Sequence, residues 1–195
     1  FRDYARLPVA ELKPLDLNAL VQDVMQLYGA ENAAVPVHAQ LDAACPIIMG
    51  DAQQMRQVVH NLLQNAQDAC EAHLPKDHPP SVTIRTEWSP LRKRVRLTVS
   101  DTGPGFESHI LQRAFEPYVT TKSKGTGLGL AVVHGVMRTH AGAVDVHSTP
   151  GQGSRFSFTL RLGRVEPAPA APPATPAGLH VLVVDADPRS RHILQ

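Results

Sequence analysis

Two glycine motifs constrain the fold of this chain more than any other feature. DTGPGF at 101–106 follows a predicted strand, and GTGLGL at 125–130 opens a predicted helix. Glycine permits tight turns and close approach of a ligand, and a helix N-terminus binds phosphate through its unpaired N–H groups. The stretch 101–130, which contains both motifs, is therefore suited to bind a polyphosphate. It is neither a P-loop nor a dinucleotide-binding motif, because GxxxxGK[ST] and a glycine motif within a βαβ unit are both missing from the sequence.

The composition predicts a soluble domain that does not bind nucleic acid. Of 195 residues, 43% are hydrophobic, and the formal net charge is +1. A core can form, but the charge gives no electrostatic reason for nucleic acid or an anionic membrane as partner. Cys45 and Cys70 are too few for a disulfide framework or a zinc site. Without a membrane-spanning apolar run or a signal-peptide pattern, we expect a cytoplasmic piece of a parent that can itself be membrane-anchored.

Three helices are predicted from caps and apolar spacing. Asp16 can cap a helix that ends at Gly29, and Asp51 with Gln54 has the spacing of a capping box for a second helix. A third helix is predicted over 128–140. The apolar face of the first consists of Leu17, Leu20, Val21, Val24, Leu27 and Tyr28. The apolar face of the second consists of Met55, Val58, Val59, Leu62, Leu63, Ala66, Ala69 and Cys70.

Strands are predicted where apolar residues alternate. One is expected over 35–41, at a sheet edge because of Pro36, and a short one over 46–49. Two hairpins complete the pattern, the first over 82–99 and the second over 144–162. Between Gly105 and Gly125 the periodicity is weak, which suits a lid over a ligand.

The domain organisation follows from composition. A globular unit is expected over 14–163, and a Pro/Ala-rich linker over 164–178. The ten histidines are scattered without metal-ligand spacing, so His60, His134 and His140 are interpreted as structural or exposed residues.

Four motifs in one order now suggest a family: HNLLQNAQDA at 60–69, DTGPGF, FEPYVTTK at 115–122, and GTGLGL. Over about residues 15–162 the chain resembles the catalytic, ATP-binding domain of sensor histidine kinases. These belong to one superfamily with gyrase, chaperone and mismatch-repair ATPases. The resemblance implies a two-layer α/β sandwich, with a mixed, mostly antiparallel sheet and helices packed on one face. It also implies ATP and Mg²⁺ as ligands.

The resemblance assigns roles to individual residues. Asn65 would be the Mg²⁺ ligand, with Asn61 one helical turn away near phosphate-bound water, and Lys122 would reach the terminal phosphates. Asp101 would accept from the exocyclic amine of adenine, so ATP should be preferred over GTP. The other predicted nucleotide contacts are Gly103, Gly105, Phe115, Thr120, Thr121, Gly125, Thr126, Gly127, Leu128, Gly129 and Leu130. Asp68 could assist the adenine pocket through water or simply belong to the polar face.

Asn61 bears on the reaction. Related ATPases carry at this position a Glu that activates water, whereas an amide cannot take that proton. We therefore expect transfer of the γ-phosphoryl group to a histidine rather than hydrolysis. Two alternatives stay open: a regulatory module that binds nucleotide without transfer, and a slow ATPase.

The resemblance also implies partners. The acceptor histidine would lie on an upstream dimerisation domain, of which 1–13 would be the tail and connector. Residues 179–195 resemble the start of a response-regulator receiver domain, as in a hybrid kinase. There Asp185 matches the first acid of the receiver, but Ala186 replaces the second. We expect receiver domains in cis or in trans as partners, a monomeric fragment and a homodimeric parent.

Overall fold

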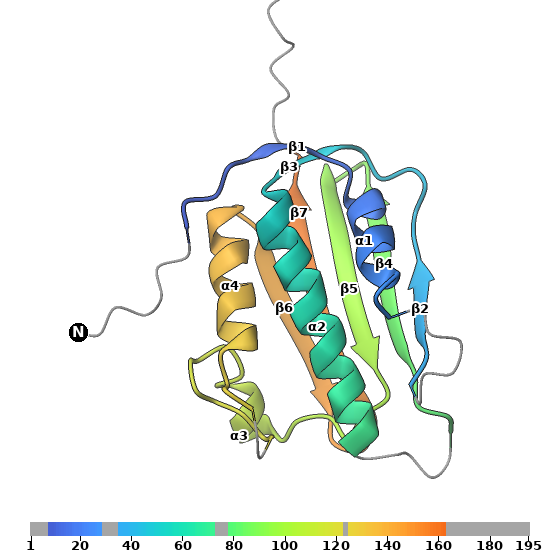
Figure 1. Ribbon diagram of the computed structural model, residues 1–195, viewed down its shortest axis with the longest axis vertical. Coiled ribbons are helices and arrows are strands. Elements are labelled where there is room, and N and C mark those ends of the chain that lie inside the picture. Colours follow the sequence, from blue (N-terminus) through green and yellow to red (C-terminus); the bar gives the residue numbers. More distant parts are fainter. Residues whose placement is uncertain (1–7, 29–34, 73–77, 123–124, 163–195) are drawn as a thin grey trace, which may run out of the picture. The chain divides into compact units, whose positions relative to one another are not determined.

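A five-stranded sheet forms one layer of the structure (Figure 1). The computed structural model describes residues 8–28, 35–72, 78–122 and 125–162. The strand order is β2-β4-β5-β7-β6; β2 runs parallel to β4, and the other pairs are antiparallel. The bounds are β2 Val37–Gln40, β4 Val82–Ser89, β5 Arg94–Asp101, β6 Ala143–Thr149 and β7 Gly153–Arg161. The predicted edge position of the strand after Pro36 and both predicted hairpins are confirmed.

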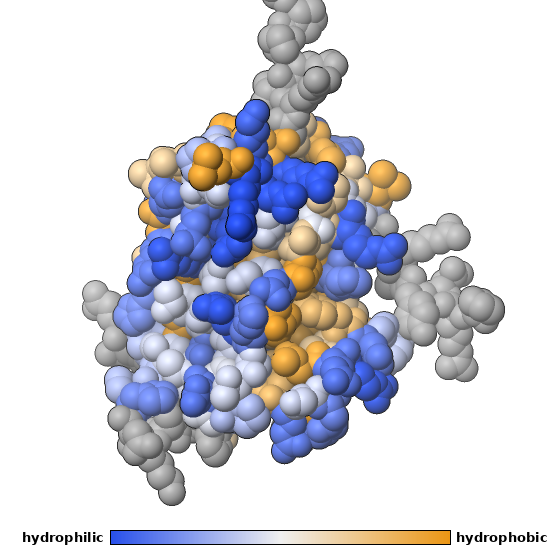
Figure 2. Space-filling model, turned by 180° about the vertical axis from the view of Figure 1, so that it is seen from behind, coloured by the Kyte–Doolittle hydropathy of each residue, from blue (hydrophilic) through white to orange (hydrophobic). Residues whose placement is uncertain are grey.

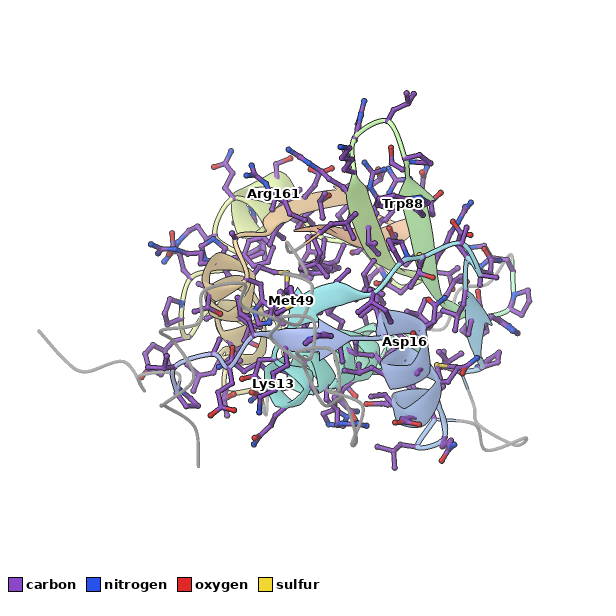
Figure 3. All side chains as sticks on the ribbon, turned by 90° about the horizontal axis from the view of Figure 1, so that it is seen from above. Lys13, Asp16, Met49, Trp88 and Arg161 are labelled. Carbon is purple, nitrogen blue, oxygen red and sulfur yellow. The ribbon has the colours of Figure 1, made fainter. Side chains whose placement is uncertain are left out.

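Three helices, α1 (Leu17–Met25), α2 (Ala52–Ala72) and α4 (Gly129–Thr139), form the second layer. All three lie on one face of the sheet (Figures 1 and 3). The central helix is α2, which contacts α1 and α4 as well as β4 and β5. A four-residue helix, α3, Ser108–Leu111, lies in the predicted lid. The predicted fold class, a two-layer α/β sandwich with a mixed, mostly antiparallel sheet, is confirmed.

The core lies between these two layers. On α2 the predicted apolar stripe is buried, apart from partly covered Ala69. The sheet contributes Val82, Ile84, Val95, Leu97, Val99, Phe156, Phe158 and Leu160. The opposite face of the sheet carries polar and charged side chains, and hydrophilic residues cover much of it in Figure 2. This one-sided burial explains the alternating pattern of the hairpin strands.

A second, two-stranded sheet was only half predicted. β3, Ile48–Gly50, pairs antiparallel with β1, Lys13–Leu15. In Figure 3 the labelled Lys13 and Met49 mark these two strands at one end of the sandwich. The sequence pattern did not predict β1, because a strand of three residues around Pro14 is too short to show a period.

Two local predictions need correction. α1 ends at Met25, so Leu27 lies beyond the helix and is 76% exposed rather than part of the core. At α2, Asp51 Oδ1 accepts from Gln54 N at 3.0 Å, as predicted. The Gln54 side chain does not complete the capping box; its Nε2 donates to the Pro8 carbonyl at 2.8 Å.

Other predictions fall on residues outside the described ranges. These are the upstream tail over 1–7, the linker over 164–178 and the receiver start over 179–195. Within the described ranges, the helices are too short or too polar to cross a membrane.

Candidate functional site

One face of α2 brings the four sequence motifs together. A Cβ built on Gly103 would lie 3.1 Å from Ala69 Cβ, and one built on Gly129 would lie 3.5 Å from Asn65 Nδ2. One turn earlier, Asn61 Nδ2 donates to the Gly129 carbonyl at 3.4 Å. Asn61, Asn65 and Ala69 therefore line a face of α2 that borders the loop after β5 and the start of α4.

Asp101 stands at the end of β5, where the ladder pairs it with Ser154 of β7. Its Oδ1 accepts from Gly103 N at 2.9 Å and from Ser154 N at 3.3 Å. Burial raises the pKa of the Asp101 carboxyl, and these two N–H groups partly oppose the rise. Within the described residues, Oδ2 receives no hydrogen bond, so the protein holds one oxygen of the carboxylate and leaves the other available.

Lys122 connects the predicted lid to α2. Its Nζ lies 2.6 Å from Asp68 Oδ2 and 3.0 Å from Asn65 Oδ1. Both charged side chains are 35% exposed. Burial raises the pKa of Asp68, but hydrogen bonds from Lys122 and Gln64, together with the Lys122 charge, outweigh it and hold the pKa below its usual range. Asp68 thus serves the lysine, which neither of the two sequence-based interpretations anticipated.

The glycines of the last motif pack against the lid. Gly127 has φ +68°, and a Cβ there would lie 2.5 Å from the Tyr118 carbonyl carbon. The backbone N–H of Tyr118 donates to the Gly127 carbonyl at 2.9 Å. A Cβ on Gly125 would lie 2.5 Å from Thr120 Oγ1, which accepts from Lys122 N at 3.1 Å. Side chains at these two glycines would separate the lid from the start of α4.

Aromatic contacts fix the beginning and the middle of the lid. Phe115 packs edge-on against Phe156 of β7, with ring centroids 6.4 Å apart, and lies 5.6 Å from the His134 ring on α4. Phe106 meets the same Phe156 ring edge-on at 6.3 Å. The predicted lid role of Phe115 therefore includes anchoring that segment to the core.

Several predicted site residues stand apart from these contacts. Gly105 has φ +69°, and a Cβ there would collide with the Thr149 carbonyl. The lack of a side chain at Gly105 therefore lets its loop pack closely against the end of β6. Leu130 packs partly buried against the core. Thr121, Thr126 and Leu128 are exposed.

Two contributors to the Asp101 site were not predicted from the sequence. Ser154 donates its backbone N–H to the carboxylate, and Gly153, at φ +103°, leaves no room for a Cβ beside the Asp101 carbonyl. Both residues lie within the predicted hairpin over 144–162. Only the pairing of β5 with β7 places them beside the end of β5 at Asp101.

The fold defines a class: ATPase domains in which a layer of helices covers one face of a mixed, mostly antiparallel sheet and glycine-containing loops lie beside the central helix. The chain belongs to the family described as histidine kinase-, DNA gyrase B-, and HSP90-like ATPases, whose model matches residues 50–164.

Relatives and solved structures agree with this assignment. The chain is 34% identical over 151 residues to the sensor histidine kinase ZraS of Escherichia coli O157:H7, covering 76% of this chain and 31% of that protein. It is 31% identical over 178 residues to the nitrogen regulation protein NtrY of Azorhizobium caulinodans, covering 90% and 23%. The chain thus spans about a third or less of these relatives.

Among solved structures, full-length ShkA in complex with AMPPNP has a TM-score of 0.65 at 32% identity, covering 77% of this chain and 31% of that one. The catalytic domain of the histidine kinase ThkA has a TM-score of 0.64 at 25% identity, covering 77% and 95%. The predicted resemblance to sensor histidine kinases is confirmed at the level of the domain.

Proposed function

We propose that this chain binds Mg²⁺-ATP beside α2 and transfers the γ-phosphoryl group to a histidine on an upstream dimerisation domain. The proposal rests on the contacts made by the segment Asn65–Ala69 of α2. Its Ala69 end meets the loop that begins at Asp101, and its Asn65 and Asp68 side chains meet Lys122 of the lid. The carboxylate proposed to bind the base and the lysine proposed to bind phosphate thus border the same helical turn.

The Asp101 carboxylate supports recognition of adenine. Because Gly103 N and Ser154 N both donate to Oδ1, the carboxylate is held in place and Oδ2 can accept from an exocyclic amine. A hydrogen bond to an ionised acceptor contributes about 1.5–3 kcal/mol.

The residues fit a bound magnesium ion. Asn65 Oδ1 is already in contact with a cation, the Lys122 ammonium, so this oxygen faces positive charge. Mg²⁺ keeps several waters and takes one or two protein oxygens, which an amide on α2 can supply. When bound, the ion would neutralise phosphate charge. Lys122 would add a second positive charge, and the N-terminus of α4 would offer backbone N–H groups to the phosphates.

The position of Asn61 supports transfer rather than hydrolysis. Its amide cannot act as a general base, and its Nδ2 is directed to the Gly129 carbonyl at 3.4 Å. We infer that this side chain orients groups near the phosphates while the nucleophile comes from the partner domain. In the same proposal, residues 179–195 begin a receiver domain, joined through the linker over 164–178, and the parent is a homodimer.

Calorimetry with ADP and Mg²⁺ tests the nucleotide part. We expect saturable binding by the chain, and loss of the Mg²⁺-dependent part of the affinity in Asn65→Ala. If no heat of binding is measured at millimolar ligand, the assignment of the site is wrong.

A transfer assay tests the reaction. The chain is mixed with the upstream histidine-bearing segment of its parent and γ-labelled ATP, and acid-labile label on that segment is expected. Binding without labelling would favour the regulatory alternative. Steady phosphate release that survives Asn61→Ala but is lost in Asn65→Ala would favour the slow ATPase.

A further inference from the structure

The Lys122 ammonium is held by two oxygens of the same helix face. Asn65 Oδ1 and Asp68 Oδ2 lie 3.0 and 2.6 Å from Nζ. Residues three apart on a helix are neighbours on its surface, so the two oxygens converge on one point beside α2. This point is a position where the fold already accommodates positive charge.

The Asp68 carboxylate is oriented by a second contact. Gln64 Nε2 donates to Asp68 Oδ1 at 2.8 Å, which leaves Oδ2 directed toward Lys122. A group that orients a carboxylate in this way is characteristic of metal sites, where a neighbouring hydrogen bond fixes the ligand. An amide oxygen and a carboxylate oxygen are also the ligands that Mg²⁺ and Mn²⁺ prefer.

We propose that Asn65 Oδ1 and Asp68 Oδ2 form one cation site, occupied alternately by the Lys122 ammonium and by the divalent ion of the nucleotide complex. Asp68 is then a second protein ligand of the metal. This inference rests on the proposed function, because the nucleotide brings the ion to the site.

The replacement of the Lys122 ammonium by a divalent ion changes the net charge of the site. Asp68 and Lys122 together carry no net charge. When a divalent ion takes the two oxygens, Lys122 is released, and the lysine, the ion and Asp68 together carry a net charge of +2 that faces the phosphates. Lys122 can then contact a phosphate oxygen as an ammonium donor. The site thus keeps its lysine paired until the anionic ligand arrives.

Calorimetry on the full chain separates this proposal from a plain ion pair. ADP affinity is measured with and without Mg²⁺ for the unchanged chain, for Asp68→Asn and for the control Asp145→Asn. The control makes the same chemical change in an exposed pair with His147 on β6. We expect Asp68→Asn to reduce the Mg²⁺-dependent gain in affinity by about 10- to 100-fold, and the control to keep it.

The outcomes are distinct. If Asp68→Asn keeps the full Mg²⁺-dependent gain, Asp68 only pairs with the lysine and the proposal is overturned. If the unchanged chain binds no ADP with or without Mg²⁺, the proposed function itself fails. Circular dichroism checks that the variants fold, which is expected because Asp68 is 35% exposed.

A metal titration without nucleotide tests the alternation. Lys122→Met removes the competing ammonium while retaining an unbranched side chain. We expect electron paramagnetic resonance to report tighter Mn²⁺ binding by Lys122→Met than by the unchanged chain, and loss of that gain in Lys122→Met/Asp68→Asn. Equal Mn²⁺ affinity in Lys122→Met and the unchanged chain would overturn the shared cation site.

Discussion

His140 Nε2 accepts a hydrogen bond from the backbone N–H of Asp51 at 2.9 Å, which joins the residue after α4 to the residue before α2. The other ring nitrogen, Nδ1, lies 2.8 Å from the Val136 carbonyl. A backbone N–H can only donate and a carbonyl can only accept, so the ring carries its proton on Nδ1. The buried imidazole satisfies the N–H that the Gln54 side chain would have taken in a complete capping box.

Replacing His140 should therefore destabilise the domain. His140→Leu leaves the Asp51 N–H without an acceptor, and we expect a loss of about 1–3 kcal/mol in the free energy of unfolding. Urea denaturation measures this. His147→Leu, which removes an exposed pair with Asp145, should change stability by less than about 1 kcal/mol. Similar losses in both variants would show that the contact with Asp51 has no special weight.

Asp101→Asn should stabilise the folded domain at neutral pH while weakening nucleotide binding. The amide oxygen can keep the bonds from Gly103 and Ser154, and the variant avoids burying a charge. Burial raises the pKa of Asp101 in the folded state, so protonation of this carboxyl favours folding. The resulting contribution to the free energy of unfolding is complete below the pKa of Asp101 in the unfolded chain. It is lost as the pH rises through the pKa in the folded state.

The stability difference between Asp101→Asn and the unchanged chain should therefore grow from acid toward neutral pH and then level off. Urea denaturation at several pH values checks the sign. If the stability difference shrinks as the pH rises, burial is not the dominant influence on the pKa of Asp101.

The chain should bind ATP more tightly than GTP. Guanine presents a carbonyl where adenine presents an amine, so the Asp101 carboxylate would face another acceptor. We expect the dissociation constant of GTP to be about tenfold larger than that of ATP, or more, because a hydrogen bond to a charged group is lost. Competition titrations measure the ratio. Asp101→Asn should reduce the preference, because an amide offers both a donor and an acceptor; equal affinity in the unchanged chain would exclude Asp101 as the base-reading residue.

Gly153 should tolerate a side chain worse than Gly151, although both have positive φ; Gly151 lies in the β6–β7 turn and Gly153 begins β7. A Cβ on Gly151 meets nothing within 4 Å, whereas one on Gly153 collides with the Asp101 carbonyl. We expect Gly151→Ala to cost about 1–2 kcal/mol for the left-handed backbone, and Gly153→Ala to cost about 1–3 kcal/mol more from the overlap. Denaturant unfolding gives both values, and equal costs would argue against close packing at Asp101.

Much of the fold was readable from the sequence because its signals are local. The apolar stripe from Met55 to Cys70, the cap at Asp16 and the alternating hairpin strands depend on spacings of a few residues. Where the local signal was weak, prediction failed. The strand around Pro14 was too short to show a period, and Leu27 kept the helical spacing after the helix had ended.

The sequence by itself determined the four motifs, their order and the elements that carry them, and these were sufficient to predict the family and most candidate site residues. Only the tertiary structure decided which groups meet. Lys122 reaches Asp68 across 54 positions, Ser154 reaches Asp101 across 53, and His140 reaches Asp51 across 89. Such contacts depend on strand register and on how helices pack, and no periodicity within a single segment encodes them.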